Sequence, residues 1–367
     1  MRVVTVVGAR PQFIKAAAVS RELRRAHEEI LVHTGQHYDY EMSGIFFDGL
    51  DLPRPNVNLS VGSRPHGAQT AAMLGGIEAV LIAQAPDYVL LYGDTNSTLA
   101  GALAASKLSI AVCHVEAGLR SFNRRMPEEI NRVVTDHLSA LLLCPSDTAV
   151  ANLAAEGISA NVHVVGDVML DVLEWARERM SDDGEAPLRK LGLTERRYLL
   201  VTLHRSENID APSRLRGILH ALNSQGEPVV LPLHPRTRKA IGTAGFELGG
   251  HVRVIEPVGY LDMIRLTHSA RLVLTDSGGL QKEAYWLRVP CLTLRDETEW
   301  VETVASGWNM LVGSDSDRIV GSVRTFAPPA PHPPLYGEGR AASQCVALLG
   351  RGVQGTDRHS CATSLSS

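Results

Sequence analysis

Residues 88–115, YVLLYGDTNSTLAGALAASKLSIAVCHV, decide the fold class, because they hold two short apolar segments on either side of one helical pattern. The segments at 88–92 and 111–115 are mainly apolar and lack the regular polar alternation of a half-exposed strand. Such runs are typical of strands that are covered on both faces, as in a parallel sheet. Residues 98–107 predict the connecting helix, so the stretch is one strand–helix–strand unit.

The same alternation runs through both halves of the chain. In the first half we predict strands at 3–7, 30–33, 88–92, 111–115 and 140–144, and helices at 11–25, 69–83, 98–107, 128–137, 147–156 and 170–180. In the second half we predict strands at 198–203, 228–233, 252–255, 271–275 and 290–294, and helices at 214–224, 262–268 and 279–286. Repeated units of this kind predict an α/β protein with two doubly wound, Rossmann-like domains facing a cleft.

Two changes in composition predict where the domains end. The polar segment 181–187 contains Gly and Pro and interrupts the alternation, so we predict domains at 1–180 and 188–326. A Pro-rich run follows the second domain, and we expect a last helix within 336–350 that packs back on the first domain. The tail at 351–367 is rich in Gly, Ser and Thr, and we expect it to be disordered.

The composition of the 367 residues argues against several classes of protein. The apolar fraction of 44% and the charged fraction of 21% are ordinary, and a net charge of -4 indicates no nucleic-acid or membrane-surface partner. No segment approaches the roughly 18–20 apolar residues of a membrane span, and the apolar N-terminal run is too short for a signal sequence. The five scattered cysteines form no CxxC pair, which fits a reducing, cytoplasmic compartment.

Two cations follow the first predicted strand. The segment Gly8-Ala-Arg-Pro-Gln-Phe-Ile-Lys15 combines a glycine for a tight turn with Arg10 and Lys15 at a helix start. Cations and free backbone N–H groups at such a place suit an anion such as a phosphate. A capped helix with solvent-exposed basic residues explains the same pattern, so both interpretations stay open.

Three carboxylates occupy comparable positions in the first half. Asp94 and Glu116 follow predicted strands, and Glu128 lies in the first turn of a predicted helix. Helix capping is the alternative for Asp94, and a favourable interaction with the helix dipole is the alternative for Glu128. Carboxylates grouped in one cleft have displaced pKa values and suit proton transfer to and from carbon.

In the second half, His204 and His234 each lie at the end of a predicted strand. Arg205 directly follows His204, and Arg236 follows His234 after Pro235. A lone histidine is usually structural, but this position at the carboxyl end of a strand favours a functional role. We therefore treat both histidines as candidate site residues.

The strongest single pattern is Leu274-Thr-Asp-Ser-Gly-Gly-Leu-Gln-Lys-Glu283, in which a strand turns through Ser277, Gly278 and Gly279 into a helix. Glycines let backbone N–H groups approach an oxyanion, and the helix N-terminus adds partial positive charge. Glu283 lies one helical turn further on, where it suits ribose hydroxyls. The pattern predicts a nucleotide diphosphate site, with an ordinary strand–helix turn as the alternative.

The sequence indicates no metal site. Asp315-Ser-Asp317 resembles a metal-binding DxD motif, but it opens a predicted helix, so capping is the better interpretation. The chain also lacks GxGxxG, P-loop, HExxH and GxSxG motifs.

Seven motifs in a fixed order resemble one enzyme family. They are Gly8-Ala-Arg-Pro11, Tyr92-Gly-Asp-Thr95, His114-Val-Glu-Ala-Gly-Leu-Arg120, Pro127-Glu-Glu-Ile-Asn-Arg132, Thr202-Leu-His-Arg205, Thr275-Asp-Ser-Gly-Gly279 and Arg295-Asp-Glu-Thr-Glu299. Together they resemble the non-hydrolysing UDP-N-acetylglucosamine 2-epimerases, from residue 1 to about residue 325.

The resemblance implies a glycosyltransferase GT-B-like fold and an isomerase that interconverts UDP-N-acetylglucosamine and UDP-N-acetylmannosamine. It implies that a carboxylate removes the C2 proton while UDP leaves C1, that a 2-acetamidoglucal forms, and that a proton and UDP then return. It further implies no metal or redox cofactor, and a cytoplasmic homodimer that serves cell-surface polysaccharide biosynthesis. The expected proton-transfer groups and catalytic histidine are Asp94, Glu116, Glu128 and His204, and the expected substrate-binding residues are Arg10, Lys15, His234, Ser277, Gly278, Gly279 and Glu283.

Two departures from the family pattern bear on the substrate. Members acting on UDP-N-acetylglucosamine usually carry Arg-Pro where this chain has Trp300-Val-Glu302, and the spacing of Gln36-His37 from Met42 argues against activation by a second substrate molecule. Several short segments of the sequence resemble more closely the sister branch that epimerises UDP-2,3-diacetamido-2,3-dideoxyglucuronate. Its 6-carboxylate needs a cation, for which Arg124 and Arg125 are candidates.

Three rival functions share parts of these patterns. A glycosyltransferase of the same fold shares the diphosphate turn but needs an acceptor, and a hydrolysing epimerase releases UDP and free N-acetylmannosamine. A non-catalytic nucleotide-sugar binder explains the phosphate site but leaves Asp94, Glu116 and Glu128 without a task.

Overall fold

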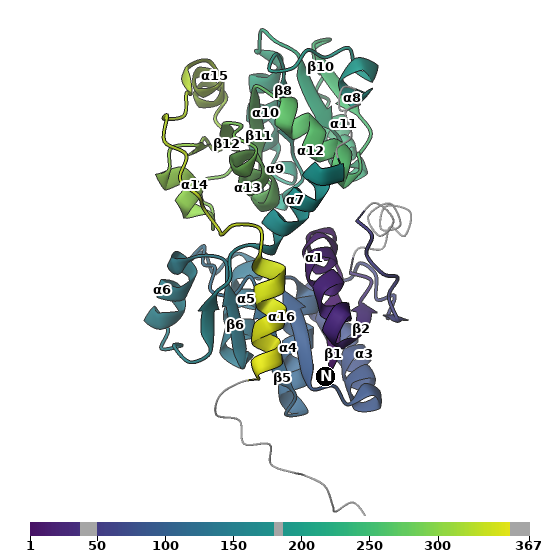
Figure 1. Cartoon of the computed structure of the whole chain (residues 1–367). Coiled ribbons are helices and arrows are strands. Elements are labelled where there is room, and N and C mark those ends of the chain that lie inside the picture. The colour runs from purple at the N-terminus through teal and green to yellow at the C-terminus, as the bar shows by residue number, and fades with distance from the viewer. Residues whose placement is uncertain (37–49, 180–185, 353–367) are drawn as a thin grey trace, which may run out of the picture.

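The computed structural model describes residues 1–36, 50–179 and 186–352. These residues form two lobes, each built around its own parallel sheet, as Figure 1 shows. The first sheet has the strand order β3-β2-β1-β4-β5-β6-β7, and the second has the order β10-β9-β8-β11-β12-β13. The predicted fold class is confirmed: this is a two-domain α/β protein with a GT-B-like arrangement.

The strands of both sheets are short and pair in parallel throughout. Those of the first sheet are β1 (Arg2–Val7), β2 (Glu28–His33), β3 (Val57–Asn58), β4 (Tyr88–Tyr92), β5 (Ala111–Val115), β6 (Leu141–Cys144) and β7 (Val162–Val164). Those of the second are β8 (Leu199–Thr202), β9 (Val229–Pro232), β10 (Val252–Ile255), β11 (Leu272–Thr275), β12 (Cys291–Thr293) and β13 (Asn309–Leu311).

Helices connect the strands and cover both faces of each sheet. In the first domain they are α1 (Arg10–Ala26), α3 (His66–Gln84), α4 (Asn96–Lys107), α5 (Pro127–Leu138), α6 (Asp147–Ala155) and α7 (Val168–Arg179). The remainder are α8 (Ala186–Lys190), α9 (Ser206–Ile209), α10 (Pro212–Asn223), α11 (Pro235–Thr243), α12 (Tyr260–Ser269), α13 (Gly278–Trp286), α14 (Val301–Ala305), α15 (Ser316–Thr325) and α16 (Ala341–Arg351).

The order of the strands reverses once in each sheet. In the first sheet β1 lies between β2 and β4, and in the second β8 lies between β9 and β11. At such a point the loops after neighbouring strands diverge to opposite faces and leave a crevice at the carboxyl ends of the strands. The fold therefore places the loops after β1, β4, β8 and β11 where a ligand would bind.

One buried apolar cluster joins the two domains. It includes Leu90 of β4, Leu173 of α7 and Leu280 of α13, all of which are buried. Helix α7 packs against α1 and α16 of the first domain and against α12 and α13 of the second. Burial of apolar surface at about 25 cal/mol per Å² therefore contributes to holding the domains together.

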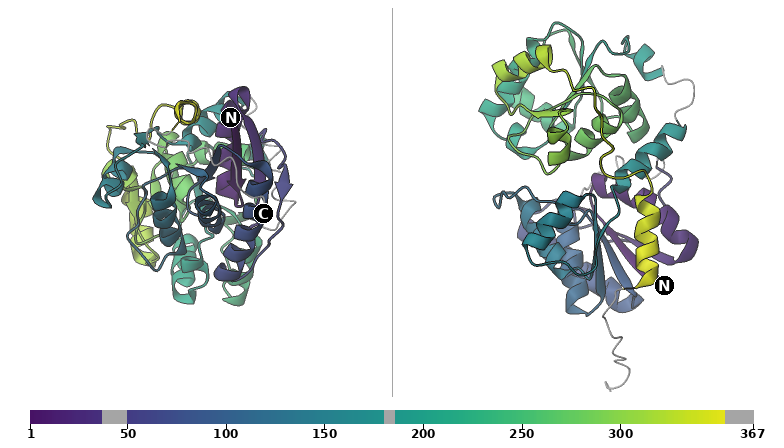
Figure 2. Two further views of the ribbon diagram at one scale, coloured as in Figure 1. Left: turned by 90° about the horizontal axis from the view of Figure 1, so that it is seen from below. Right: turned by 60° about the vertical axis from the view of Figure 1, so that its left-hand side comes forward.

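The chain crosses between the domains twice. The first crossing runs from β7 through α7, and the second is the segment between α15 and α16. Figure 2 shows α16, in yellow, lying along the first domain, where it packs on α1. Its first backbone N–H groups, from Ala341 and Ala342, donate to Asp171 of α7 at 3.1 and 2.9 Å. Burial raises the pKa of Asp171 to about 6, although these two bonds lower it.

All ten predicted strands are present, and their ends agree to within two residues. The prediction missed β3, β7 and β13, which have two or three residues each and lie at or near sheet edges. The predicted domain boundary at 181–187 lies mostly outside the described residues and stays a prediction, as does the disorder expected for the tail at 351–367, of which only 351 and 352 are described.

A bilayer crossing needs a long apolar helix, and none occurs within residues 1–36, 50–179 and 186–352.

The turn after β5 gives a prediction about stability. Gly118 has a φ of +80°, and a Cβ atom there would lie 2.4 Å from the carbonyl oxygen of Ala149. We expect Gly118→Ala to lower the free energy of unfolding by roughly 2–4 kcal/mol, because strain and overlap with a backbone atom add together. Urea unfolding measures this change.

Gly157→Ala is the matched control. Gly157 has a φ of +81° but no atom within 4 Å of an added Cβ, so it carries only the backbone cost, about 1 kcal/mol. Equal losses in the two variants would show that the contact with Ala149 does not matter.

Candidate active site

A buried ion pair joins the carboxyl ends of the two sheets. Glu116 follows β5 in the first domain, and its Oε2 lies 3.4 Å from Nζ of Lys282, in α13 of the second domain. Its Oε1 accepts a hydrogen bond from Lys15 of α1. The first-domain carboxylate therefore lies between a cation of its own domain and a cation of the partner domain.

Two further contacts and deep burial fix the position of Lys282. Its ammonium bonds Asp167, which precedes α7, and lies 3.6 Å from the ring centroid of Trp300. Only 1% of the Lys282 side chain is exposed. A buried ammonium requires this degree of pairing, since an unpaired one would release its proton or move to solvent.

Asp94 belongs to a short polar network with residues of α5, the helix that carries Glu128. Arg132 of α5 bonds the carboxylate of Asp94, and Asn131 donates to its backbone oxygen at 2.9 Å. Glu128 is half-buried and lies one helical turn before these two residues, so it shares their side of α5. The cap of α4 is Thr95, so the capping alternative for Asp94 is wrong.

Arg10 and Glu283 bring opposite charges from the two domains into the same region. Burial lowers the pKa of Arg10, and the charge of Glu283 partly offsets this effect. Burial also raises the pKa of Glu283 to about 7, against the lowering effects of Tyr260, Lys282 and Arg10. Within the described residues, Oε1 of Glu283 has no hydrogen-bond partner, which leaves an acceptor for a ligand hydroxyl.

His204 is held from behind by a buried carboxylate. Its Nδ1 lies 2.9 Å from Oδ1 of Asp276, and the backbone N–H groups of His204 and Arg205 also donate to Asp276. Burial alone would raise the pKa of Asp276, but His204 and these N–H groups lower it below the usual value. The carboxylate fixes the orientation of the imidazole and leaves Nε2 for a ligand.

The predicted diphosphate turn opens α13 as expected. Ser277 is the N-cap, and its Oγ accepts the N–H of Leu280 at 3.5 Å. A Cβ atom at Gly278 would lie 2.9 Å from Nε1 of Trp300, so the indole N–H lies against the turn. The departure from Arg-Pro thus puts a different donor, Trp300, beside the predicted phosphate site.

Residues 297–302, around Trp300, contact the first domain. Glu297 accepts from Asn123 at 2.7 Å, and Glu302 accepts from Ser146 at 2.6 Å. Glu299 pairs with Arg295 at 2.9 Å, and the charge of this arginine holds the pKa of Glu299 well below its usual range despite burial. This segment therefore attaches the second domain to the first.

Most of the predicted site residues lie at the carboxyl ends of the strands of the two sheets. His234 also has a structural role. This exposed residue is the N-cap of α11, and its Nδ1 accepts the N–H of Arg236 at 3.2 Å. The DxD interpretation is settled in favour of capping, because Asp315 accepts the N–H of Arg318 at 2.8 Å.

Sequence reasoning missed the supporting charges of this site: Lys282, Asp167, Asp276 and Arg132. Lys282 and Asp276 lie within the Leu274–Glu283 pattern itself, so their closeness to the predicted turn could have indicated that they belong to the site. Asp167 gave no signal, because its partner is 115 residues away in sequence.

Comparison with known proteins decides the family. The model of the UDP-N-acetylglucosamine 2-epimerase family matches residues 21–350. The chain belongs to this family. It is 51% identical over 354 residues to a UDP-N-acetylglucosamine 2-epimerase homolog of Methanococcus maripaludis, covering 95% of this chain and 99% of the relative.

Two further members of the family are similar over nearly their whole length. The UDP-2,3-diacetamido-2,3-dideoxy-D-glucuronate 2-epimerase of Pseudomonas aeruginosa is 50% identical over 362 residues, covering 96% of this chain and 100% of the relative. The crystal structure of the Methanocaldococcus jannaschii UDP-GlcNAc 2-epimerase with UDP-GlcNAc and UDP superimposes with a TM-score of 0.90 at 41% identity. That comparison covers 96% of this chain and 100% of the solved one.

The raised pKa of Glu283 gives a prediction about pH. Between its ordinary pKa of 4.5 and about 7, the folded protein keeps a proton that the unfolded chain has lost. The free energy of unfolding contributed by this group therefore falls as pH rises through that window. Glu283→Gln removes the effect, and we expect the variant to gain roughly 1–3 kcal/mol relative to the parent between pH 5 and pH 8.

Urea unfolding at pH 5, 6, 7 and 8 without ligand checks this difference. The control is Glu247→Gln, which alters an exposed glutamate and should leave the profile unchanged. Parallel profiles for the parent and Glu283→Gln would contradict the prediction.

Proposed function

We propose that this chain is a non-hydrolysing 2-epimerase that interconverts UDP-N-acetylglucosamine and UDP-N-acetylmannosamine. The observation that carries the proposal is the contact of Lys282 with Glu116, which brings the carboxylates after β4 and β5 to the Ser277 turn of the second domain. Membership of the 2-epimerase family supports the same activity. An isomerase of this kind needs both halves of the site in one gap.

The second domain suits the UDP part of the substrate. Free N–H groups at the start of α13, beside Gly278 and Gly279, suit the diphosphate. His204, oriented by Asp276, adds a donor that stabilises charge as UDP leaves. The unpaired Oε1 of Glu283 suits a ribose hydroxyl.

The first domain suits the sugar. The C2 hydrogen is weakly acidic, so its removal must be assisted by departure of the diphosphate from C1. One of Asp94, Glu116 and Glu128 takes this proton, and another returns a proton to the opposite face of the 2-acetamidoglucal. UDP then adds back to C1. Arg10 and Lys15 lie where they compensate the negative charge of these groups and of the diphosphate.

A second substrate is favoured by two observations. The chain is 50% identical to the diacetamido-glucuronate 2-epimerase of Pseudomonas aeruginosa over nearly its full length. Arg124 and Arg125 are exposed and have no ion-pair partner in the part of the chain that the structure describes. They directly follow Asn123, which donates to Glu297 of the second domain, so they lie near the place where the domains meet and suit a sugar 6-carboxylate.

The proposal includes a homodimer in the cytoplasm, where nucleotide sugars serve polysaccharide biosynthesis. Both features follow from resemblance to the family. Size-exclusion chromatography with light scattering tests the dimer, because a monomer would elute with the 39.7 kDa mass of one chain.

Proton exchange distinguishes this function from its rivals. In D2O, we expect the parent enzyme to place deuterium at C2 of UDP-N-acetylglucosamine while UDP stays attached, as followed by NMR. Glu116→Gln keeps the shape but removes the carboxylate, and we expect turnover to fall by about 100- to 10,000-fold. Glu247→Gln is the matched control and should exchange at the parent rate.

Each alternative function gives a different result in the same assay. Release of UDP with free N-acetylmannosamine indicates a hydrolysing epimerase, and release only with an acceptor indicates a glycosyltransferase. Binding without exchange or release, with this sugar and the diacetamido-uronate, indicates a binder and overturns the proposal.

The arginine pair tests the second substrate. We expect Arg124→Gln/Arg125→Gln to raise KM for the diacetamido-uronate by about tenfold or more, because a charge-assisted hydrogen bond contributes roughly 1.5–3 kcal/mol. Turnover of UDP-N-acetylglucosamine should stay near the parent rate. The control is Lys107→Gln in α4, an exposed cation. Equal losses on both sugars would reject a role for these arginines in substrate choice.

A further inference from the structure

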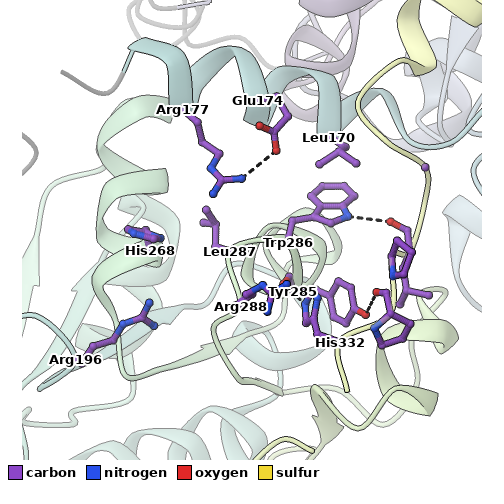
Figure 3. A pocket seen from close by; sticks show the side chains of 14 residues that line it. Leu170, Glu174, Arg177, Arg196, His268, Tyr285, Trp286, Leu287, Arg288 and His332 are labelled. Carbon is purple, nitrogen blue, oxygen red and sulfur yellow. Dashed lines mark hydrogen bonds and ion pairs between the residues drawn. The ribbon is translucent and has the colours of Figure 1, made fainter. Parts of the chain in front are cut away.

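A pocket of about 500 Å³ lies away from the candidate active site. It lies between α7, the ends of α12 and α13, and residues 332–337 of the second crossing, and we call it the crossing pocket (Figure 3). No carboxylate assigned to proton transfer lines it, and neither does the Ser277 turn. Its volume is in the range of pockets that hold small organic ligands.

The lining of the crossing pocket carries excess positive charge. The lining contains three arginines and one carboxylate. Of the arginines, Arg177 of α7 pairs with this carboxylate, Glu174, at 3.1 Å. Arg196 donates to the backbone oxygen of Ala270 at 3.1 Å but has no carboxylate partner among the described residues. Arg288 likewise has no acidic partner in the part of the chain that the structure describes. Two guanidinium groups thus remain for an anion.

The backbone holds both of these arginines in an uncommon conformation. Arg196 has a φ of +57° and Arg288 a φ of +55°, in the left-handed region that favours glycine. Each costs of order 1 kcal/mol relative to an extended residue. A glycine would remove this cost, and it would also remove the guanidinium from the pocket.

His268 adds a neutral polar group between two of the arginines. Burial lowers its pKa, and the charges of Arg196 and Arg177 lower it further. Within the described residues its buried Nδ1 has no hydrogen-bond partner. Figure 3 shows His268 on the same side of the pocket as Arg177 and Arg196. The imidazole is therefore an additional group for a ligand oxygen.

The other side of the pocket is flat and largely apolar. Tyr285 stacks on His332 with ring centroids 4.2 Å apart, and Trp286 donates its indole N–H to the backbone oxygen of Leu335 at 3.2 Å. Leu170 and Leu287 complete this surface. Rings fixed in this way suit a planar apolar group better than a flexible chain.

We propose that the crossing pocket binds a phosphorylated organic molecule that carries a planar apolar group. The guanidinium groups of Arg196 and Arg288 bind the phosphate, because a planar fork of donors matches its oxygens, and the paired Arg177 adds positive charge to the lining. The rings at Tyr285 and Trp286 contact the planar group. An inorganic ion would fill only a small part of about 500 Å³.

The position of this site joins three parts of the molecule. Helix α7 and residues 332–337 belong to the two crossings between the domains, and α13 carries the candidate diphosphate turn at its other end. A ligand in the pocket therefore contacts both described crossings without touching the carboxylates assigned to proton transfer.

Calorimetric titration of the full chain with 1-naphthyl phosphate tests the proposal. Saturating UDP is added first to occupy the active site, a step that rests on the proposed function. We expect 1-naphthyl phosphate to bind once per chain, and 1-naphthol and inorganic phosphate to bind at least about tenfold more weakly. Lack of UDP binding would count against the proposed function alone, since the titration without UDP still reports on the pocket.

Variants assign the binding to the pocket. We expect Arg196→Gln/Arg288→Gln to weaken 1-naphthyl phosphate by about tenfold or more, while UDP binding is unchanged. Arg25→Gln/Lys107→Gln, on exposed helix surfaces of the first domain, should bind like the parent. If the double variant does not fold, Arg288→Glu replaces it, because Arg288 is exposed and a reversed charge should abolish binding. No binding by the parent, or parent affinity in the arginine variants, overturns the proposal.

Discussion

The arrangement of the two domains depends on one buried ammonium group, that of Lys282. It bonds Asp167 at the first crossing, approaches Glu116 after β5 and lies over the ring of Trp300, so three separate segments meet at one charge. Transfer of an ammonium group into a protein interior costs several kcal/mol, and good pairing offsets this cost without a large surplus. We therefore attribute specificity of domain position to Lys282, and most of the stability to the apolar cluster around α7.

The backbone and the buried residues around Glu116 hold this carboxylate towards Lys282. Glu116 has a φ of +70°, so the chain turns sharply after β5 and directs this carboxylate towards the lysines. Behind it, His114 lies between Asp136, at 2.7 Å, and the backbone oxygen of Gly93, at 2.7 Å. Both ring nitrogens of His114 lie within hydrogen-bond distance of these oxygens. A buried, hydrogen-bonded layer thus supports the strand end on which Glu116 lies.

The sequence alone predicted the fold, because buried parallel strands leave a local pattern, and the placement of the site at the carboxyl ends of the strands stays a prediction. The edge strands β3, β7 and β13 were missed because two or three residues carry no periodicity. Arg132 and Glu299 lie 167 residues apart in sequence and meet at 3.5 Å only after both domains form, so no local pattern indicates their pairing. His234 shows that a strand-end position can have a structural explanation as well: its side chain caps α11, and its place in the site stays a prediction.

Helix α13 links the candidate active site to the crossing pocket, and its dipole distinguishes the two ends. The N-terminus at Gly278 favours an anion, whereas the C-terminus at Trp286 disfavours one by about 0.3–1 kcal/mol. Arg288 alone could be explained as a cation that complements this C-terminus. That explanation does not account for Arg196, which lies on another segment, or for Arg177 on α7. Charge-assisted hydrogen bonds contribute roughly 1.5–3 kcal/mol each, so two guanidinium groups outweigh the dipole and make the pocket favourable for an anion.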